Sequence, residues 1–97
     1  MKHPTKLKIA GHDIEIIYKD VVIKDGDECL GYAEADKNKM YIKKGLEPSK
    51  FTEVLFHESL HIIDDNFRMN LEELRVNTLG LELPRFIKDN KLWRLFK

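Results

Sequence analysis

Two histidines stand four residues apart in the stretch LFHESLHIID, residues 55–64, and a glutamate directly follows the first of them. Residues four apart lie on one face of a helix, so His57 and His61 can present two imidazole nitrogens to one metal ion. Glu58 lies about 100° further around the helix, outside easy reach of the same ion. This pattern is typical of zinc hydrolases, in which the carboxylate takes a proton from a zinc-activated water. The spacing therefore predicts His57 and His61 as Zn2+ ligands and Glu58 as the catalytic general base.

A catalytic zinc normally has three protein ligands, so a third is expected from a neighbouring element. Glu72 and Glu73 open the next predicted helix, and a short turn into an antiparallel helix would return either carboxylate to the metal. Glu73 has a competing interpretation, because Asn70 stands three residues before it, the spacing of a capping box. Asp64 and Asp65 are further alternatives, and Asp64 is placed to contact the outer histidine nitrogens. Spacing alone leaves the third ligand open.

The first half of the chain has the patterns of short strands. KLKIAGHDIEIIYKD alternates loosely around a Gly-His pair, which predicts a hairpin. The cluster DGDE at 25–28 predicts a turn, and CLGYAEADKNKMYIKKG at 29–45 predicts a second strand pair around DKNK. The apolar residues expected to face inward are Ile9, Ile14, Ile16, Tyr18, Met40 and Ile42.

The second half has a helical pattern from Pro48, a residue that suits the first turn of a helix. Apolar residues wrap most of this helix, which indicates burial on more than one side. NFRMN at 66–70 is expected to break the helix, and Asn70 to cap a second one. Pro84 is expected to end or kink that helix, because proline removes a backbone donor. A final short helix is expected to dock Trp93 on the core.

The fold class expected from this order is α+β, with a small antiparallel sheet packed on the motif helix and one or two further helices. Ninety-seven residues predict one domain, 1–97, strand-rich over 6–45 and helical over 48–97.

Charge and cysteine content exclude several classes of protein. Lys+Arg 17 against Asp+Glu 17 leaves no net charge, which argues against nucleic acid or anionic membrane as a partner. The single cysteine, Cys29, excludes an internal disulfide and fits a reducing compartment. No apolar run approaches the length of a signal peptide or a membrane span. We therefore predict a small soluble cytoplasmic protein; the sequence does not indicate an oligomeric state.

HESLH followed by EELRVNTLGLELP, residues 72–84, resembles the ImmA/IrrE-like zinc metallopeptidases, in particular their short members encoded by phages and prophages. In that family the His-Glu-x-x-His motif precedes a helix of the form Glu-x-x-Ala-Asn-x-Phe-Ala, then Leu and Pro. The matching helix here runs from Glu73 to Gly80, followed by Leu83 and Pro84. The resemblance implies a zincin-like fold, Glu73 as the third Zn2+ ligand and a phage or prophage setting. It also implies a protein or peptide substrate, which in larger relatives is a repressor-type regulator.

Two functions from different classes fit these observations. One is a zinc-dependent metallopeptidase that hydrolyses a peptide bond in a protein substrate. The alternative is a non-catalytic zinc-binding regulatory or protein-interaction module with a structural or degenerate site. For the peptidase, an extended peptide could join the strand pair at 29–43 as an added strand. The candidate donors for stabilising an oxyanion are Tyr18, Tyr32, Tyr41 and His12, and their spacing selects none of them.

Overall fold

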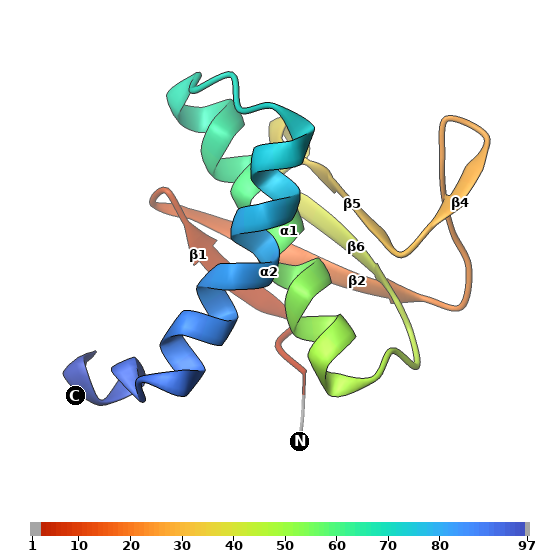
Figure 1. Ribbon diagram of the computed structural model, residues 1–97. Coiled ribbons are helices and arrows are strands. Elements are labelled where there is room, and N and C mark those ends of the chain that lie inside the picture. The colour runs from red at the N-terminus through yellow and green to blue at the C-terminus, as the bar shows by residue number, and fades with distance from the viewer. Residues whose placement is uncertain (1–2, 97) are drawn as a thin grey trace.

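The computed structural model describes residues 3–96, in which all the strands precede the two α-helices. Figure 1 shows three layers: a sheet, helix α1 lying on one of its faces, and helix α2 packed on α1. The class is α+β, as predicted. The elements are β1 (Lys6–Ile9), β2 (His12–Lys19), β3 (Val22–Lys24), β4 (Asp27–Cys29), β5 (Gly31–Glu34), β6 (Lys39–Lys43), α1 (Pro48–Phe67), α2 (Glu73–Asp89) and the 3-10 helices η1 (Ala35–Lys37) and η2 (Leu92–Phe96).

The main sheet is mixed, with the strand order β1-β2-β6-β5. The two predicted hairpins are present, since β1 pairs antiparallel with β2 and β5 pairs antiparallel with β6. The prediction of an antiparallel sheet is nevertheless wrong for one pair, because β2 and β6 run parallel. β5 starts at the same end of the sheet where β2 finishes, and it therefore runs antiparallel to β2. The strand hydrogen-bonded to β2 is β6, which returns in the direction of β2. β5 is left as an edge strand.

A third hairpin, β3–β4, leaves the main sheet between β2 and β5. We predicted only a turn at 25–28, whereas the turn is confined to Asp25 and Gly26 and the next residues belong to β4. Both turn residues have positive φ, 54° and 85°. That conformation matches the right-handed twist of the two strands and favours an Asp-Gly pair. Figure 1 shows the hairpin standing out beyond the start of β5.

The core lies between the sheet and α1. Its buried residues are Ile9, Ile14, Ile16, Met40, Ile42, Phe51, Val54 and Ile62. This confirms the inward positions predicted for the strands, apart from the half-buried Tyr18, which packs against the cluster. The helical members follow one another at spacings of three and four residues with Glu58 among them, so the stripe of α1 that faces the sheet carries one carboxylate.

Helix α2 begins at Glu73, and the prediction that Asn70 caps it is wrong. The N-cap residue is Glu72, without a side-chain hydrogen bond, and Asn70 has a left-handed backbone conformation with φ 54°. The connecting loop is instead tied to α1, because the Leu71 N–H donates to Asp64 Oδ1 at 3.2 Å. The capping-box alternative for Glu73 therefore fails.

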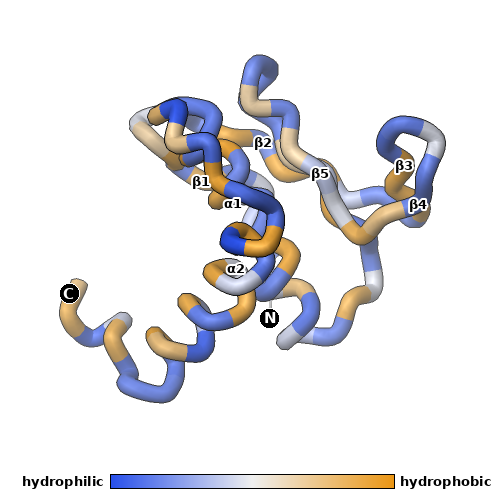
Figure 2. The backbone as a smooth tube through the Cα atoms, turned by 45° about the horizontal axis from the view of Figure 1, so that its top comes forward, coloured by the Kyte–Doolittle hydropathy of each residue, from blue (hydrophilic) through white to orange (hydrophobic). Residues whose placement is uncertain are grey.

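The second half of α2 extends away from the sheet. Pro84 lies inside the helix, which continues to Asp89, and Figure 1 shows the ribbon turning away from its first direction there. Docking of the chain end on the core is not seen: η2 contacts α2, and Trp93 is 51% exposed. Figure 2 shows apolar and polar residues alternating along this projecting arm. Among residues 3–96, neither helix is both long and apolar enough to cross a bilayer.

Candidate metal site and cleft

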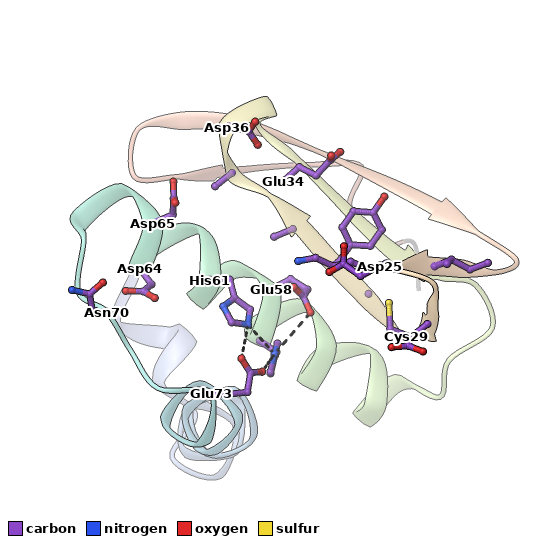
Figure 3. Close-up of a pocket in the computed structure, with 18 of the residues that line it drawn as sticks. Asp25, Cys29, Glu34, Asp36, Glu58, His61, Asp64, Asp65, Asn70 and Glu73 are labelled. Atoms are coloured by element: carbon purple, nitrogen blue, oxygen red, sulfur yellow. Dashed lines mark hydrogen bonds and ion pairs between the residues drawn. The ribbon is translucent and has the colours of Figure 1, made fainter.

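His57, His61 and Glu73 converge where α1 meets α2 (Figure 3). The Nε2 atoms of the two histidines are 3.1 Å apart. One Glu73 oxygen, Oε1, lies 3.0 Å from His57 Nε2, and the other, Oε2, lies 3.4 Å from His61 Nε2. Among the residues that the structure describes, these three form the only group of at least three side chains able to hold a metal ion.

The donor set fits a small tetrahedral cation such as zinc. Atoms bound to zinc at 2.0–2.1 Å with tetrahedral angles lie about 3.3–3.4 Å from one another. The two Nε2 atoms, 3.1 Å apart, are near that separation, and each histidine has a different Glu73 oxygen 3.0 or 3.4 Å away. With one ligand atom taken from each residue, the three atoms lie within 4.8 Å of one another. Two imidazole nitrogens and one carboxylate are also a ligand set that zinc uses in hydrolases. Three protein ligands leave a fourth position available for water.

The packing of α2 on α1 brings Glu73 to the histidines. Glu73, Val76 and Gly80 are spaced three and four residues apart, so they share the face of α2 that meets α1. Val76 is fully buried there. Gly80 lies against His57, since a Cβ atom added to the glycine would come within 3.2 Å of His57 Cα. The absence of a side chain at position 80 therefore allows the close approach that places Glu73.

Glu58 lies beside this group and outside it. Its Oε2 is 4.0 Å from His57 Nε2, and only 9% of its side chain is exposed. Burial raises the pKa of the Glu58 carboxyl to about 7; Lys24 lowers this pKa and Glu73 adds to the increase. A carboxyl group with a pKa near neutrality both accepts and returns a proton readily at physiological pH.

His57 is the more enclosed of the two histidines, with 20% of its side chain exposed against 33% for His61. Burial lowers the pKa of His57, and the adjacent His61 lowers it further, while Glu73 opposes both effects. Each effect that lowers the pKa favours the neutral imidazole. Neutral imidazole is the form that binds a metal ion.

The other candidate ligands lie outside the group. Glu72 remains at the N-cap of α2, and Asp64 accepts the Leu71 N–H. Asp65 lines the surrounding cleft without joining the cluster.

Of the four candidate oxyanion donors, Tyr32 lines the cleft. Tyr18 donates its hydroxyl to the Pro4 carbonyl, and the Tyr41 hydroxyl is engaged with Glu34, which raises the pKa of Tyr41. His12 is exposed at the start of β2, away from the residues that line the cleft.

The cluster opens into a cleft of about 1230 Å³ between α1 and the edge strand β5. All four residues of β5 line it, together with the β3–β4 hairpin. Figure 3 shows Glu58, His61 and Glu73 near its middle, Asp25 and Cys29 toward one end, and Asp64, Asp65 and Asn70 toward the other. We did not identify Asp25 and Asp27 as site residues from the sequence, although the Asp-Gly pair is a strong hairpin signal that would have placed them on a projecting turn.

Comparisons of the chain with protein-family models, curated protein sequences and solved structures find no match.

Proposed function

We propose that the protein is a zinc-dependent metallopeptidase with a zincin-like site. The observation that carries this proposal is the convergence of His57, His61 and Glu73 beside a buried Glu58 at the middle of an open cleft. A purely structural zinc site is normally closed by four protein ligands, whereas this group offers three and faces solvent. The open cleft therefore favours catalysis over the alternative of a non-catalytic zinc-binding module.

His57, His61 and Glu73 would hold the ion. A zinc ion held by these residues would supply Lewis acidity, which would polarise the scissile carbonyl and lower the pKa of a bound water to about 7. Glu58 takes a proton from the attacking water and then passes it to the nitrogen of the leaving amine, so the same carboxyl serves as base and acid.

The edge strand β5 provides the place for substrate. Its outer edge is not paired with another strand in the main sheet, and its residues line the cleft. An extended peptide paired with β5 would gain backbone hydrogen bonds and run past the histidines. Such pairing is largely independent of side chains, and it favours a protein or peptide as the substrate.

The resemblance of HESLH and residues 72–84 to the ImmA/IrrE-like metallopeptidases supports the same assignment. The glutamate which that resemblance selects, Glu73, is the one that lies against both histidines. We extend the proposal to a phage or prophage origin on the resemblance alone.

Substitution of Glu58 by Gln tests the proposal. The zinc content after purification without chelators should stay near one ion per chain, while cleavage of a protein substrate mixture should fall by at least about 100-fold. Glu82→Gln, the same change at an exposed position of α2, is the matched control and should leave cleavage intact. Mass spectrometry of the products reports cleavage, and elemental analysis reports the metal.

Three results contradict the proposal. Cleavage that survives Glu58→Gln removes the general base from the mechanism. Metal that is absent in the wild-type protein, and that does not bind when zinc is added, removes the site. An inactive wild-type protein that unfolds on chelation favours the structural zinc module instead.

A further inference from the structure

The cleft around the candidate metal site is strongly acidic, although the chain as a whole carries no net charge. Apart from Glu58 and Glu73, six carboxylates line it against two cationic side chains, Lys24 and Arg68. The six are Asp25, Asp27, Glu34, Asp36, Asp64 and Asp65. Most of the lysines and arginines that balance the negative charge of the chain therefore lie outside the cleft.

These carboxylates come from separate elements and lie on both sides of the metal cluster. Asp25 is in the turn of the β3–β4 hairpin at one end of the cleft, and Asp65 is on α1 toward the other (Figure 3). Asp36, on η1, stands on the wall above β5. Glu58 lies between them, nine-tenths buried and aimed into the cleft. A ligand that reaches Glu58 must therefore pass between acidic groups.

The carboxylates of the cleft differ in whether they already have a partner. Glu34 pairs with Lys37 at 3.4 Å, and Asp64 accepts a hydrogen bond from the Leu71 N–H. Within residues 3–96, by contrast, Asp25, Asp36 and Asp65 are exposed and form no ion pair. A cleft lined by one sign of charge concentrates the field inside it and raises the local concentration of oppositely charged ligands.

We propose that the cleft selects basic peptide segments, with Lys or Arg side chains on both sides of the bond that is cut. This inference rests on the proposed peptidase function. A peptide paired with β5 would place its flanking side chains near the hairpin at one end and near η1 and the C-terminal part of α1 at the other. Acidic segments would be repelled from the same positions. The charge thus supplies a selectivity that backbone pairing with β5 lacks.

Three fluorescent peptides of equal length test this selectivity, differing only in Lys, Gln or Glu at the positions that flank the central bond. Binding is measured by fluorescence anisotropy to the zinc-loaded Glu58→Gln protein, which holds the peptide without cutting it. At an ionic strength of about 0.01 M the Lys peptide should bind at least about tenfold more tightly than the Gln peptide, and the Glu peptide more weakly still. The preference should largely disappear at about 1 M salt.

A matched pair of triple variants locates the effect. Asp25→Asn, Asp36→Asn and Asp65→Asn together remove three charges from the cleft. Asp13→Asn, Asp20→Asn and Asp89→Asn remove the same number outside the residues that line it. The first triple variant should lose about tenfold in affinity for the Lys peptide, and the second should lose less than about twofold. Far-ultraviolet circular dichroism verifies that both are folded.

The outcomes separate this inference from the proposed function. Equal binding of the three peptides, or equal losses in the two triple variants, overturns the selectivity. Cleavage of all three peptides by the wild-type protein at equal rates also overturns the selectivity, but it agrees with the proposed peptidase function. Charge-dependent binding without any cleavage supports the basic-segment preference and contradicts the peptidase.

Discussion

Gly80 of α2 lies against the backbone of His57 on α1, so that a Cβ atom at position 80 would come within 3.2 Å of His57 Cα and 3.3 Å of His57 N. The atoms it would meet belong to a helix backbone and cannot rotate away. The distance between the two helices at the candidate metal site is therefore set by the absence of a side chain at one position.

Gly80→Ala should weaken zinc binding without unfolding the protein. Alanine stabilises a helix by about 1 kcal/mol relative to glycine, which offsets part of the cost of the close contact. Relief of that contact moves α2 by a few tenths of an ångström, and Glu73 moves with it. Because metal ligands tolerate only about 0.2 Å, the zinc Kd should rise about tenfold. Competition with a chromophoric chelator measures this Kd.

Thr78→Ala is the control for this prediction, because Thr78 is exposed on α2 and the change also favours the helix. It should leave the zinc Kd unchanged. An unaltered Kd in Gly80→Ala would mean that the helix spacing does not control the site.

Glu73→Gln and Glu72→Gln should differ sharply in zinc affinity. Glu73 provides oxygens 3.0 and 3.4 Å from the two histidines, whereas Glu72 is the N-cap residue and lies outside the cluster. An amide lacks the negative charge that stabilises the cation, so we expect the zinc affinity of Glu73→Gln to fall at least about 100-fold. Glu72→Gln makes the same chemical change one residue away and should stay within about twofold of wild type. Equal losses would refute Glu73 as the specific ligand.

The stability of the chelated protein should fall as the pH rises, because of Glu58. Its carboxyl has a pKa of about 7 in the folded protein against 4.5 for the exposed group, so the folded state binds the extra proton. Below pH 4.5 this group contributes its full stabilisation, about 3 kcal/mol. The contribution declines between pH 4.5 and about 7 and is absent at higher pH. Urea unfolding at a series of pH values in the presence of a chelator measures the effect.

Glu58→Gln isolates this contribution. His57 acts in the opposite direction below pH 6.5, because its pKa is lowered on folding and stability rises as the unfolded chain loses its proton. The difference in the free energy of unfolding between wild type and Glu58→Gln does not contain the contribution of His57, because both proteins have this histidine. We expect the variant to be the more stable of the two above pH 7. Bound zinc should reduce the difference, since a nearby cation favours the ionised carboxylate. Parallel pH profiles for the two chelated proteins would contradict the assignment.

Gly31→Ala should destabilise the fold by about 1–3 kcal/mol. A Cβ atom at position 31 would lie 2.8 Å from the Tyr41 carbonyl oxygen and 2.9 Å from Val54 Cγ1. Both neighbours are held in place, one by β6 and one by the core, so β5 must move away from α1. Thermal unfolding followed by circular dichroism tests this, and a melting temperature equal to that of wild type would show that the strand has room.

Much of the local structure was predictable, because it follows from periodicity within one segment. The four-residue spacing of His57 and His61 places them on one helical face wherever that helix packs. Alternation likewise identified Ile14 and Ile16, Met40 and Ile42 as buried positions. The start of the long helix at Pro48 was also correct, because proline at the first turn is a local signal.

The failed predictions concern relations between segments. Alternation shows which face of a strand is buried but not the direction of its neighbour, so the parallel pairing of β2 with β6 was missed. The Asn70–Glu73 spacing suggested a cap, but the hydrogen bond from Leu71 to Asp64 ties the loop to α1 and α2 starts later. Trp93 was expected on the core, yet the arm carrying it projects past the bend near Pro84.

The sequence by itself determined the histidine pair, the glutamate next to it and the amphipathic segments, because helix and strand geometry act over a few neighbouring residues. Only the tertiary structure decided which carboxylate meets the histidines, how deeply Glu58 is buried and how the acidic groups gather around one cleft. Those properties depend on the approach of α2 to α1 at Gly80 and on the position of β5 at the edge of the sheet. Both arise from packing between parts of the chain that are distant in sequence.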